Sequence, residues 1–168
     1  VSSTDHVFSD RFNHASMMDG LFLSGGLLKR HARHERYHHN DMEDLERKLQ
    51  KAGVEEPKLI VTDGVFSMEG SIVNLPQMRR LADRYRARIY LDDAHAVGVL
   101  GATGRGTEEH FGDGFRADLL MCTFSKSFGS LGGLIAGERD VVDYIRHMAR
   151  SLIFSAAIPP SNTAAVLK

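Results

Sequence analysis

The sequence has little of three things that would restrict where the protein works. Its one cysteine, Cys122, cannot form a disulfide within the chain, so nothing here requires an oxidising compartment. The formal net charge of -1 gives no electrostatic reason to bind nucleic acid or an anionic membrane. No apolar run approaches the length that crosses a bilayer. We therefore expect a cytoplasmic protein with no nucleic-acid partner and no membrane span.

The chain also lacks the features that usually mark the two ends of a protein. It has no initiator methionine, and residues 164–168 form a helical pattern without a closing glycine or proline. No repeat, low-complexity tract or linker rich in proline, glycine and serine divides the 168 residues. This length suits one domain with its own core. We expect residues 1–168 to be an internal part of a longer protein.

Short apolar runs alternate with longer amphipathic segments along the chain. The predicted strands are 58–62, 89–91, 119–123, 134–136 and 152–154, and the predicted helices begin near Asn40, Pro76 and Val141. Strands separated by helices predict an α/β fold with a largely parallel sheet. Ligands of such sheets bind at the carboxyl ends of the strands. That rule indicates residues 63–70, 92–95 and 123–129.

Two acids, Asp92 and Asp93, directly follow the predicted strand 89–91. A carboxylate at a strand end, largely surrounded by protein, needs a partner that offsets its desolvation. A protonated ring nitrogen would be such a partner for Asp92, and His95 could reach the same ring. The structural alternative is an aspartate that caps a neighbouring helix beside a surface histidine. The pattern alone leaves both interpretations open.

A lysine among hydroxyls and glycines follows the predicted strand 119–123. Lys126 at this place suits an amine that forms a Schiff base, and the hydroxyls around it could hold a phosphate. No glycine stands at the distance before Lys126 that a Walker-type phosphate loop requires. The alternative is an exposed lysine on a flexible loop, which is the commoner state of this residue type.

Together these motifs resemble the α-oxoamine synthases, a family of fold-type-I pyridoxal-phosphate enzymes. The family includes 8-amino-7-oxononanoate synthase, glycine C-acetyltransferase, 5-aminolevulinate synthase and serine palmitoyltransferase. A single motif would be a weak signal, but this set is ordered and extends over nearly the whole chain. The matching segments are 10–16, 37–41, 62–70, 92–98, 104–106, 123–129 and 154–160.

The resemblance implies a three-layer α/β domain with a mostly parallel sheet, the large domain of aspartate aminotransferase-like enzymes that depend on pyridoxal phosphate. Residues 1–168 would be an incomplete copy of this domain. A glycine-rich segment that binds phosphate would lie before Val1, and a small domain with a substrate-binding arginine would lie beyond Lys168. Because the family builds its sites across a dimer interface, the resemblance also implies a homodimer.

Four catalytic residues are implied by the resemblance. Lys126 would bond pyridoxal 5'-phosphate covalently and later move the α-proton of the substrate. Asp92 would keep the ring nitrogen protonated, so that the ring can accept electrons. His14 would stack on the ring, and His95 would lie near its phenolic oxygen.

Three hydroxyl side chains complete the implied cofactor site. Ser67 would lie near the phenolic oxygen together with His95. Thr123 would bind the phosphate, and Ser155 would do so from the neighbouring subunit.

The implied reaction condenses an amino acid with an acyl-CoA, loses carbon dioxide and yields an α-amino ketone. Residues 124–133 are most similar in character to the serine palmitoyltransferase-like members, but which amino acid and acyl chain are used stays open. Two alternatives also remain open: a non-catalytic scaffold subunit, and a pyridoxal-phosphate-dependent aminotransferase.

The clustered histidines and the clustered arginines are interpreted as structural residues, not as metal or nucleic-acid sites. The histidines at 31, 34, 38 and 39 have no acid that completes a familiar metal motif, so we expect no metal and a solvated basic connecting stretch. The arginines at 79, 80, 84, 86 and 88 are expected to form the solvated face of one helix.

Overall fold

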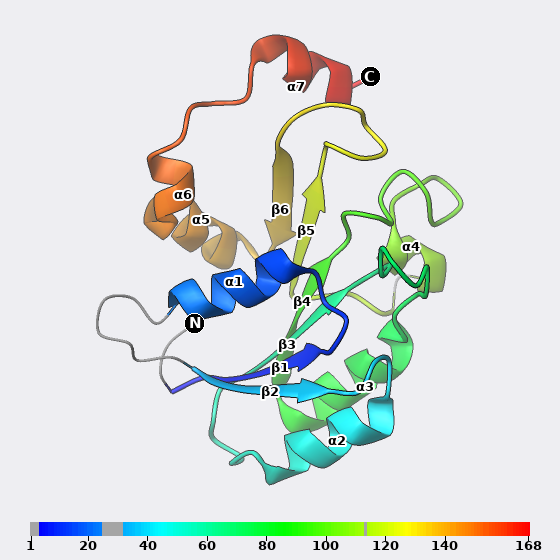
Figure 1. Cartoon of the computed structure of the whole chain (residues 1–168), viewed down its shortest axis with the longest axis vertical. Coiled ribbons are helices and arrows are strands. Elements are labelled where there is room, and N and C mark those ends of the chain that lie inside the picture. The colour runs from blue at the N-terminus through cyan, green and yellow to red at the C-terminus, as the bar shows by residue number, and fades with distance from the viewer. Residues whose placement is uncertain (1–3, 25–31, 113) are drawn as a thin grey trace.

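The computed structural model describes residues 4–24, 32–112 and 114–168. Strands and helices alternate along most of it (Figure 1). The elements are β1 (His6–Asp10), α1 (Ala15–Ser24), β2 (Arg33–Tyr37), α2 (Met42–Lys51), β3 (Lys58–Asp63), α3 (Leu75–Tyr85), β4 (Ala87–Asp92), α4 (Thr107–Phe111), β5 (Leu119–Thr123), β6 (Gly133–Gly137), α5 (Arg139–Met148), α6 (Arg150–Ile153) and α7 (Pro160–Val166).

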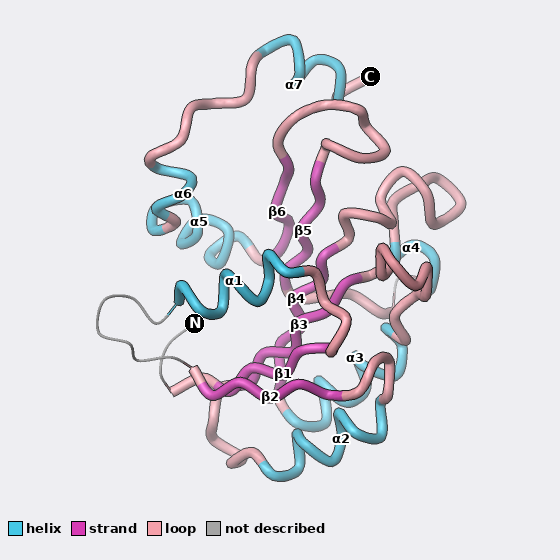
Figure 2. The backbone as a smooth tube through the Cα atoms, in the orientation of Figure 1, coloured by secondary structure: helices cyan, strands magenta, loops and turns pink. Residues whose placement is uncertain are grey.

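The described strands form one six-stranded sheet in the order β2-β1-β3-β4-β5-β6. Strands β1 to β5 run parallel to one another, and β6 pairs antiparallel with β5, as the arrows in Figure 1 show. The predicted largely parallel sheet is therefore confirmed. Figure 2 distinguishes the strands, in magenta, from the helices, in cyan. Parallel strands place their carboxyl ends at one edge, so the segments that follow β1, β3, β4 and β5 come together there.

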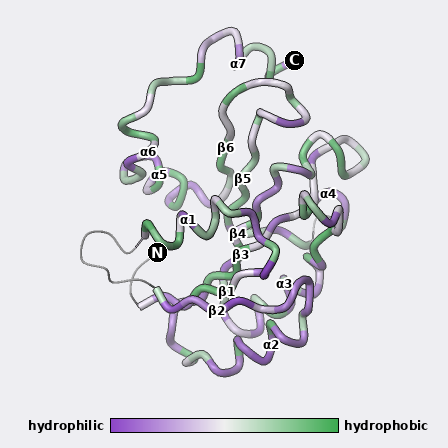
Figure 3. The backbone as a smooth tube through the Cα atoms, viewed as in Figure 1, coloured by the Kyte–Doolittle hydropathy of each residue, from purple (hydrophilic) through white to green (hydrophobic). Residues whose placement is uncertain are grey.

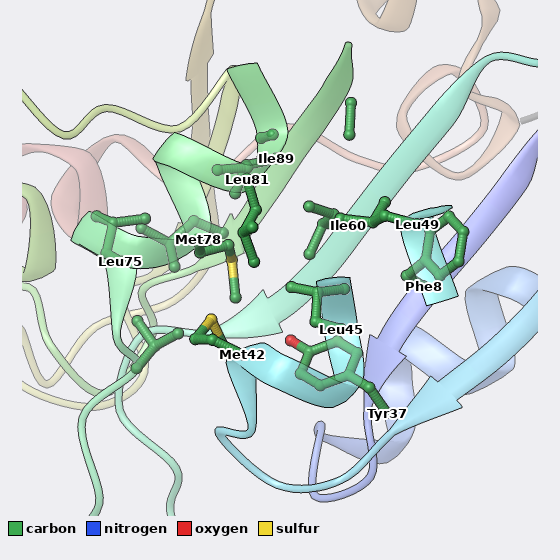
Figure 4. Close-up of a cluster of buried hydrophobic side chains, with 14 of the residues drawn as sticks. Phe8, Tyr37, Met42, Leu45, Leu49, Ile60, Leu75, Met78, Leu81 and Ile89 are labelled. Atoms are coloured by element: carbon green, nitrogen blue, oxygen red, sulfur yellow. The ribbon is translucent and has the colours of Figure 1, made fainter. Parts of the chain in front are cut away.

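Helices cover both faces of the sheet, with α2 and α3 on one side and α1 on the other (Figure 1). Successive strand residues point to opposite faces. Phe8 and Ile60 therefore enter the main core beneath α2 and α3, shown in Figure 4. Their neighbours Val7 and Val61 pack with Met17 of α1 instead. The three-layer arrangement follows, and it explains why the central strands are apolar on both faces.

The helices α2 and α3 begin where the sequence predicts. Asp41 caps α2 by accepting hydrogen bonds from the N–H groups of Glu43 and Asp44. Asn74 caps α3 in the same way through the N–H of Gln77, and Pro76 occupies its first turn. Both helices bury one apolar face, while much of α2 is hydrophilic (Figure 3).

The segment 131–168 is built differently, because none of its residues is buried. Strand β6 is exposed along its whole length although its central residues are hydrophobic (Figure 3). On α5, Tyr144 and Met148 are 66% and 59% exposed. Exposed apolar residues on β6 and α5 are typical of a surface that binds another molecule.

One predicted strand is wrong. Residues 152–154 were expected to return to the sheet, but Arg150–Ile153 form the short helix α6. The N–H groups of Ile153 and Phe154 bond to carbonyls four residues earlier, at Ala149 and Arg150. An apolar run of three residues has no periodicity that separates a strand from a helical turn.

The expected solvated stretch of histidines is also wrong in part. Residues 33–37 form the edge strand β2, and Tyr37 is fully buried. His39 lies between the Asp10 carboxylate, 3.0 Å from its Nδ1, and the Ser71 hydroxyl, 2.8 Å from its Nε2. His31 lies outside the described residues. The polar sequence of β2 is typical of an edge strand, which its neighbour stabilises through backbone hydrogen bonds.

The arginines do not share one helix face. Arg86 ends α3 in a left-handed conformation with φ 54°, and Arg88 lies on β4. Arg79 and Arg88 donate to the two oxygens of Asp118 at 2.8 and 2.7 Å. These ion pairs line a hollow away from the carboxyl ends of the strands. Their charges are already paired, so the hollow does not compete as the functional site.

Candidate functional site

The candidate site lies where the parallel strands end. Asp92 is the last residue of β4, and in the sheet register it stands directly beside Asp63, the last residue of β3. Lys126 follows the end of β5 and is exposed, whereas Asp92 is only 3% exposed. The fold thus places a buried carboxyl and an accessible amine at neighbouring strand ends.

The two adjacent acids Asp92 and Asp93 have different surroundings. Asp93 is fully buried and accepts hydrogen bonds from the N–H and hydroxyl of Thr107, at 2.9 and 2.5 Å. Asp92 accepts one backbone hydrogen bond, from the N–H of Ala94 at 3.1 Å. Asp93 therefore fastens the start of α4, and Asp92 is the carboxyl left for another partner. Sequence alone could not separate these two roles.

Electrostatics connects Asp92 with three of the other predicted site residues. Burial raises the pKa of Asp92 above its ordinary value, and the nearby Lys126, His14 and His95 oppose that rise. Burial also lowers the pKa of His95, and Lys126 lowers it further. These influences run between the ends of β1, β4 and β5, so the fold brings these four residues within electrostatic range of one another.

The turn that carries Lys126 is fastened to the turn after Asp92. The Ser127 hydroxyl donates to the Val97 carbonyl at 2.6 Å. Gly98 makes the close approach possible, since a Cβ at this position would lie 2.6 Å from Ser127, and its φ of 84° also favours glycine. These contacts fix the position of the Lys126 backbone relative to the turn that follows Asp92.

His14 lies directly before α1 and is exposed. Its ring Nδ1 is 2.8 Å from the Ser16 hydroxyl and accepts the Ser16 N–H at 3.3 Å. This bond assigns the acceptor role to Nδ1, so a neutral His14 ring carries its proton on Nε2. The backbone N–H of His14 donates to the Asp63 carboxyl at 2.8 Å.

The hydroxyl residues are more scattered. Thr123 ends β5, and its Oγ1 lies 2.9 Å from the Ser125 hydroxyl. Ser67 is exposed in the segment after β3. The Ser155 hydroxyl donates to the Ser151 carbonyl within its own segment. Ser155 follows α6 closely in the chain, and no residue of β1 to β5 is within that segment.

Asp63 is the site residue that sequence reasoning missed. It carries the same signal as Asp92, an acid directly after a buried strand, and it is 5% exposed. Burial raises its pKa to about 7. The sequence indicated the segment 63–70 as a place for ligands without singling out this carboxyl.

Two features are absent from the described residues, a metal-binding cluster and a membrane-spanning helix. These residues contain no group of three or more histidine, cysteine, aspartate or glutamate side chains placed to hold a metal ion. None of their helices has both the length and the apolar character needed to cross a membrane.

Comparison with known proteins identifies the family. The sequence matches aminotransferase class I and II over residues 1–168. It is 51% identical over 168 residues to a serine palmitoyltransferase of Sphingobacterium spiritivorum, a match that covers 100% of this chain and 41% of that protein. It is 46% identical to an 8-amino-7-oxononanoate synthase of Thermosipho melanesiensis, and this match also covers 100% of this chain and 41% of the relative.

Solved structures agree with the sequence matches. A serine palmitoyltransferase from S. paucimobilis, solved with a bound PLP–myriocin aldimine, superposes with a TM-score of 0.85 at 34% identity. The match covers 96% of this chain and 40% of that one, so the chain spans about 40% of the length of these relatives. The chain belongs to the aminotransferase class I and II family, and the relatives it matches are α-oxoamine synthases, as the motifs predicted.

Proposed function

We propose that the whole protein condenses an amino acid with an acyl-CoA in a reaction that depends on pyridoxal 5'-phosphate. The products are an α-amino ketone, carbon dioxide and free coenzyme A. The observation that carries the proposal is the buried Asp92 beside the accessible Lys126, in a chain 51% identical to a serine palmitoyltransferase.

The chemistry of the side chains fits pyridoxal phosphate. Asp92 is a buried carboxyl with a raised pKa, and the hydrogen bond from Ala94 alone does not offset its desolvation. A protonated ring nitrogen would supply the missing positive charge. Lys126 offers an exposed amine for a covalent bond. Bound pyridoxal phosphate supplies an electron sink that stabilises negative charge on the α-carbon of an amino acid.

Each catalytic side chain then has a definite task. The Asp92 carboxylate holds the proton on the ring nitrogen, which keeps the electron sink effective. The Lys126 amine holds the cofactor between turnovers and moves the α-proton when the substrate has taken its place. His14 packs against the ring, and its exposed position at the start of α1 leaves it free to do so.

The remaining contacts complete the proposed site. Ser67 and His95 would contact the phenolic oxygen, and Thr123 would bind the phosphate from the end of β5. Ser155 would reach the phosphate from a second subunit, since in this chain its hydroxyl donates to the Ser151 carbonyl within its own segment. We therefore propose a cytoplasmic homodimer with shared sites.

The domain assignment is part of the same proposal. Residues 1–168 form part of the large domain, and the glycine-rich phosphate segment and the small domain belong to other parts of the protein. The exposed apolar residues of β6 and α5 support this assignment, because they need protein to cover them.

A non-catalytic scaffold subunit is the second candidate. A scaffold needs the fold but has no use for an amine at the end of β5 beside a buried carboxyl. The presence of Lys126, Asp92, His95 and His14 together favours the enzyme. A transaminase would also need a Schiff-base lysine and a carboxyl partner for the ring nitrogen, so it must be separated by experiment.

The reaction class is tested by release of free thiol from acyl-CoA. The intact protein, loaded with pyridoxal phosphate, is incubated with glycine, serine or alanine and with acyl-CoAs of short or long chain. We expect thiol release that requires an amino acid, and we expect serine with palmitoyl-CoA to be the best pair. Absence of thiol release with every pair would contradict the proposal, and transfer of the amino group to a 2-oxo acid would identify a transaminase.

A further inference from the structure

Asp63 is a second buried carboxyl at the edge of the sheet where the site lies. It ends β3 beside Asp92 in the register, and both side chains are almost completely buried. Neither the family resemblance nor the proposed reaction assigns a role to Asp63. Burying a carboxyl group costs free energy, which some interaction must offset.

The contacts of Asp63 fasten the loop that carries His14. Its Oδ2 accepts the His14 N–H at 2.8 Å. The side chain of Asn13 bonds to the same strand end, donating to the Val61 carbonyl at 2.7 Å and accepting the Asp63 N–H at 3.3 Å. Three hydrogen bonds therefore connect this loop to the end of β3, and the Asp63 carboxyl makes the one that reaches His14 itself.

Several charged or titratable groups surround the Asp63 carboxyl. Burial has the largest effect on the pKa of Asp63 and raises it, and the neighbouring Asp92 raises it further. The hydrogen bond from the His14 N–H and the charge of Lys126 lower it. The resulting pKa is about 7. The other groups that interact with the Asp63 carboxyl come from the neighbouring strands: Asp10 on β1, Tyr37 on β2 and Tyr90 on β4. Two buried carboxyls side by side disfavour double ionisation, so one of them takes up a proton more readily.

We propose that Asp63 is a positioning residue of the site, which carries the proton of the Asp63–Asp92 pair and fixes the turn that presents His14. With Asp63 neutral, Asp92 keeps its negative charge for the ring nitrogen of the cofactor. A protonated Asp63 still accepts the His14 N–H through its carbonyl oxygen, so both tasks are compatible. This inference rests on the proposed function, because it takes Asp92 and His14 as cofactor contacts.

The first test compares the stability of the intact, cofactor-free protein with that of Asp63→Asn as the pH changes. A carboxyl whose pKa is raised by folding stabilises the protein below its unfolded pKa of 3.8, and this contribution is lost as the pH rises toward about 7. Asparagine does not titrate. We expect the folding constant of the wild type to fall relative to the variant by about 300-fold between pH 4 and 7, measured by urea unfolding.

Asp83→Asn is the matched control, since the Asp83 side chain is 68% exposed on α3, away from the site. This variant should follow the wild type across the whole pH range. Parallel curves for the wild type and Asp63→Asn would overturn the inference, because Asp63 would then be an ordinary ionised carboxylate.

The second test measures the dissociation constant of pyridoxal phosphate. Asparagine retains an oxygen that can accept the His14 N–H, whereas alanine does not. We expect Asp63→Ala to weaken binding by about tenfold and Asp63→Asn to weaken it clearly less. Equal affinities in the two variants would exclude the positioning role.

The two tests separate this inference from the proposed function. The stability test uses cofactor-free protein, so its result does not depend on whether Lys126 bonds the cofactor. If Lys126 carries the cofactor and the stability curves are parallel, the enzyme assignment stands and the inference about Asp63 fails.

Discussion

Asp92→Ala is expected to lower the turnover number of the intact enzyme by about 10²- to 10⁴-fold. Removing one partner of a buried charge pair costs about 3–5 kcal/mol, and each 1.36 kcal/mol corresponds to about tenfold in rate. Without the Asp92 carboxylate nothing at this position holds the proton on the ring nitrogen. The measurement is the steady-state rate of thiol release at saturating substrates.

The same substitution should leave folding almost unchanged. The pKa of Asp92 is raised by burial, so its ionisation makes the cofactor-free protein less stable as the pH rises through that pKa. Removing Asp92 removes this cost, and the variant should be no less stable than the wild type near neutral pH. Asp83→Asn again serves as the exposed control. A fully active Asp92→Ala would show that the acid at the end of β4 is not the partner of the cofactor.

Unlike Asp92→Ala, Asp93→Ala is expected to destabilise the fold. We expect it to lower the free energy of unfolding by about 2–4 kcal/mol. Burial raises the pKa of Asp93 as well, but both of its oxygens accept hydrogen bonds from Thr107 at the start of α4, and we expect these bonds to outweigh the cost of its ionisation. Alanine leaves these two donors without partners. The surroundings are also tight, since a Cβ at Gly64 or Gly106 would lie 2.2 or 2.0 Å from the Asp93 oxygens.

Chemical unfolding of the intact protein measures this loss, with Asp93→Asn as the matched variant. Asparagine keeps one acceptor oxygen, so we expect it to lose roughly half as much stability as alanine. Wild-type stability in Asp93→Ala would mean that α4 is held without this carboxyl. The loss of activity of the Asp92 variant and the loss of stability of the Asp93 variant together test the division of roles between the two acids.

That division shows how far the sequence alone could lead. Both acids follow an apolar strand, and side-chain alternation places them on opposite faces. Which one meets the site depends on where α4 begins, and Thr107 is separated from Asp93 by a long segment of turns. A pattern of neighbouring residues contains no information about that contact. Motif resemblance favoured Asp92, and the structure supplies the physical reason.

The fold was predictable where an apolar run or an amphipathic pattern marks the element, whereas the buried strand β1, which contains His6, Ser9 and Asp10, was missed. The apolar runs at β3 and β5 and the amphipathic pattern of α3 are local signals, and all three elements were found. Strand β2 was missed because its residues are polar, and it exists through its pairing with β1. The strand predicted at 152–154 was wrong for a different reason: these residues are apolar, but they are exposed and do not pack in the core. Elements at an edge or surface depend on neighbours that the local sequence does not reveal.

The central claim is that Lys126 bonds the cofactor, and borohydride reduction tests it most directly. The intact protein is loaded with pyridoxal phosphate, reduced, digested and analysed by mass spectrometry. We expect the reduced cofactor on the peptide that contains Lys126, and we expect Lys126→Ala to carry no covalent adduct. An adduct on a different lysine, or one that persists unchanged in Lys126→Ala, would contradict the account.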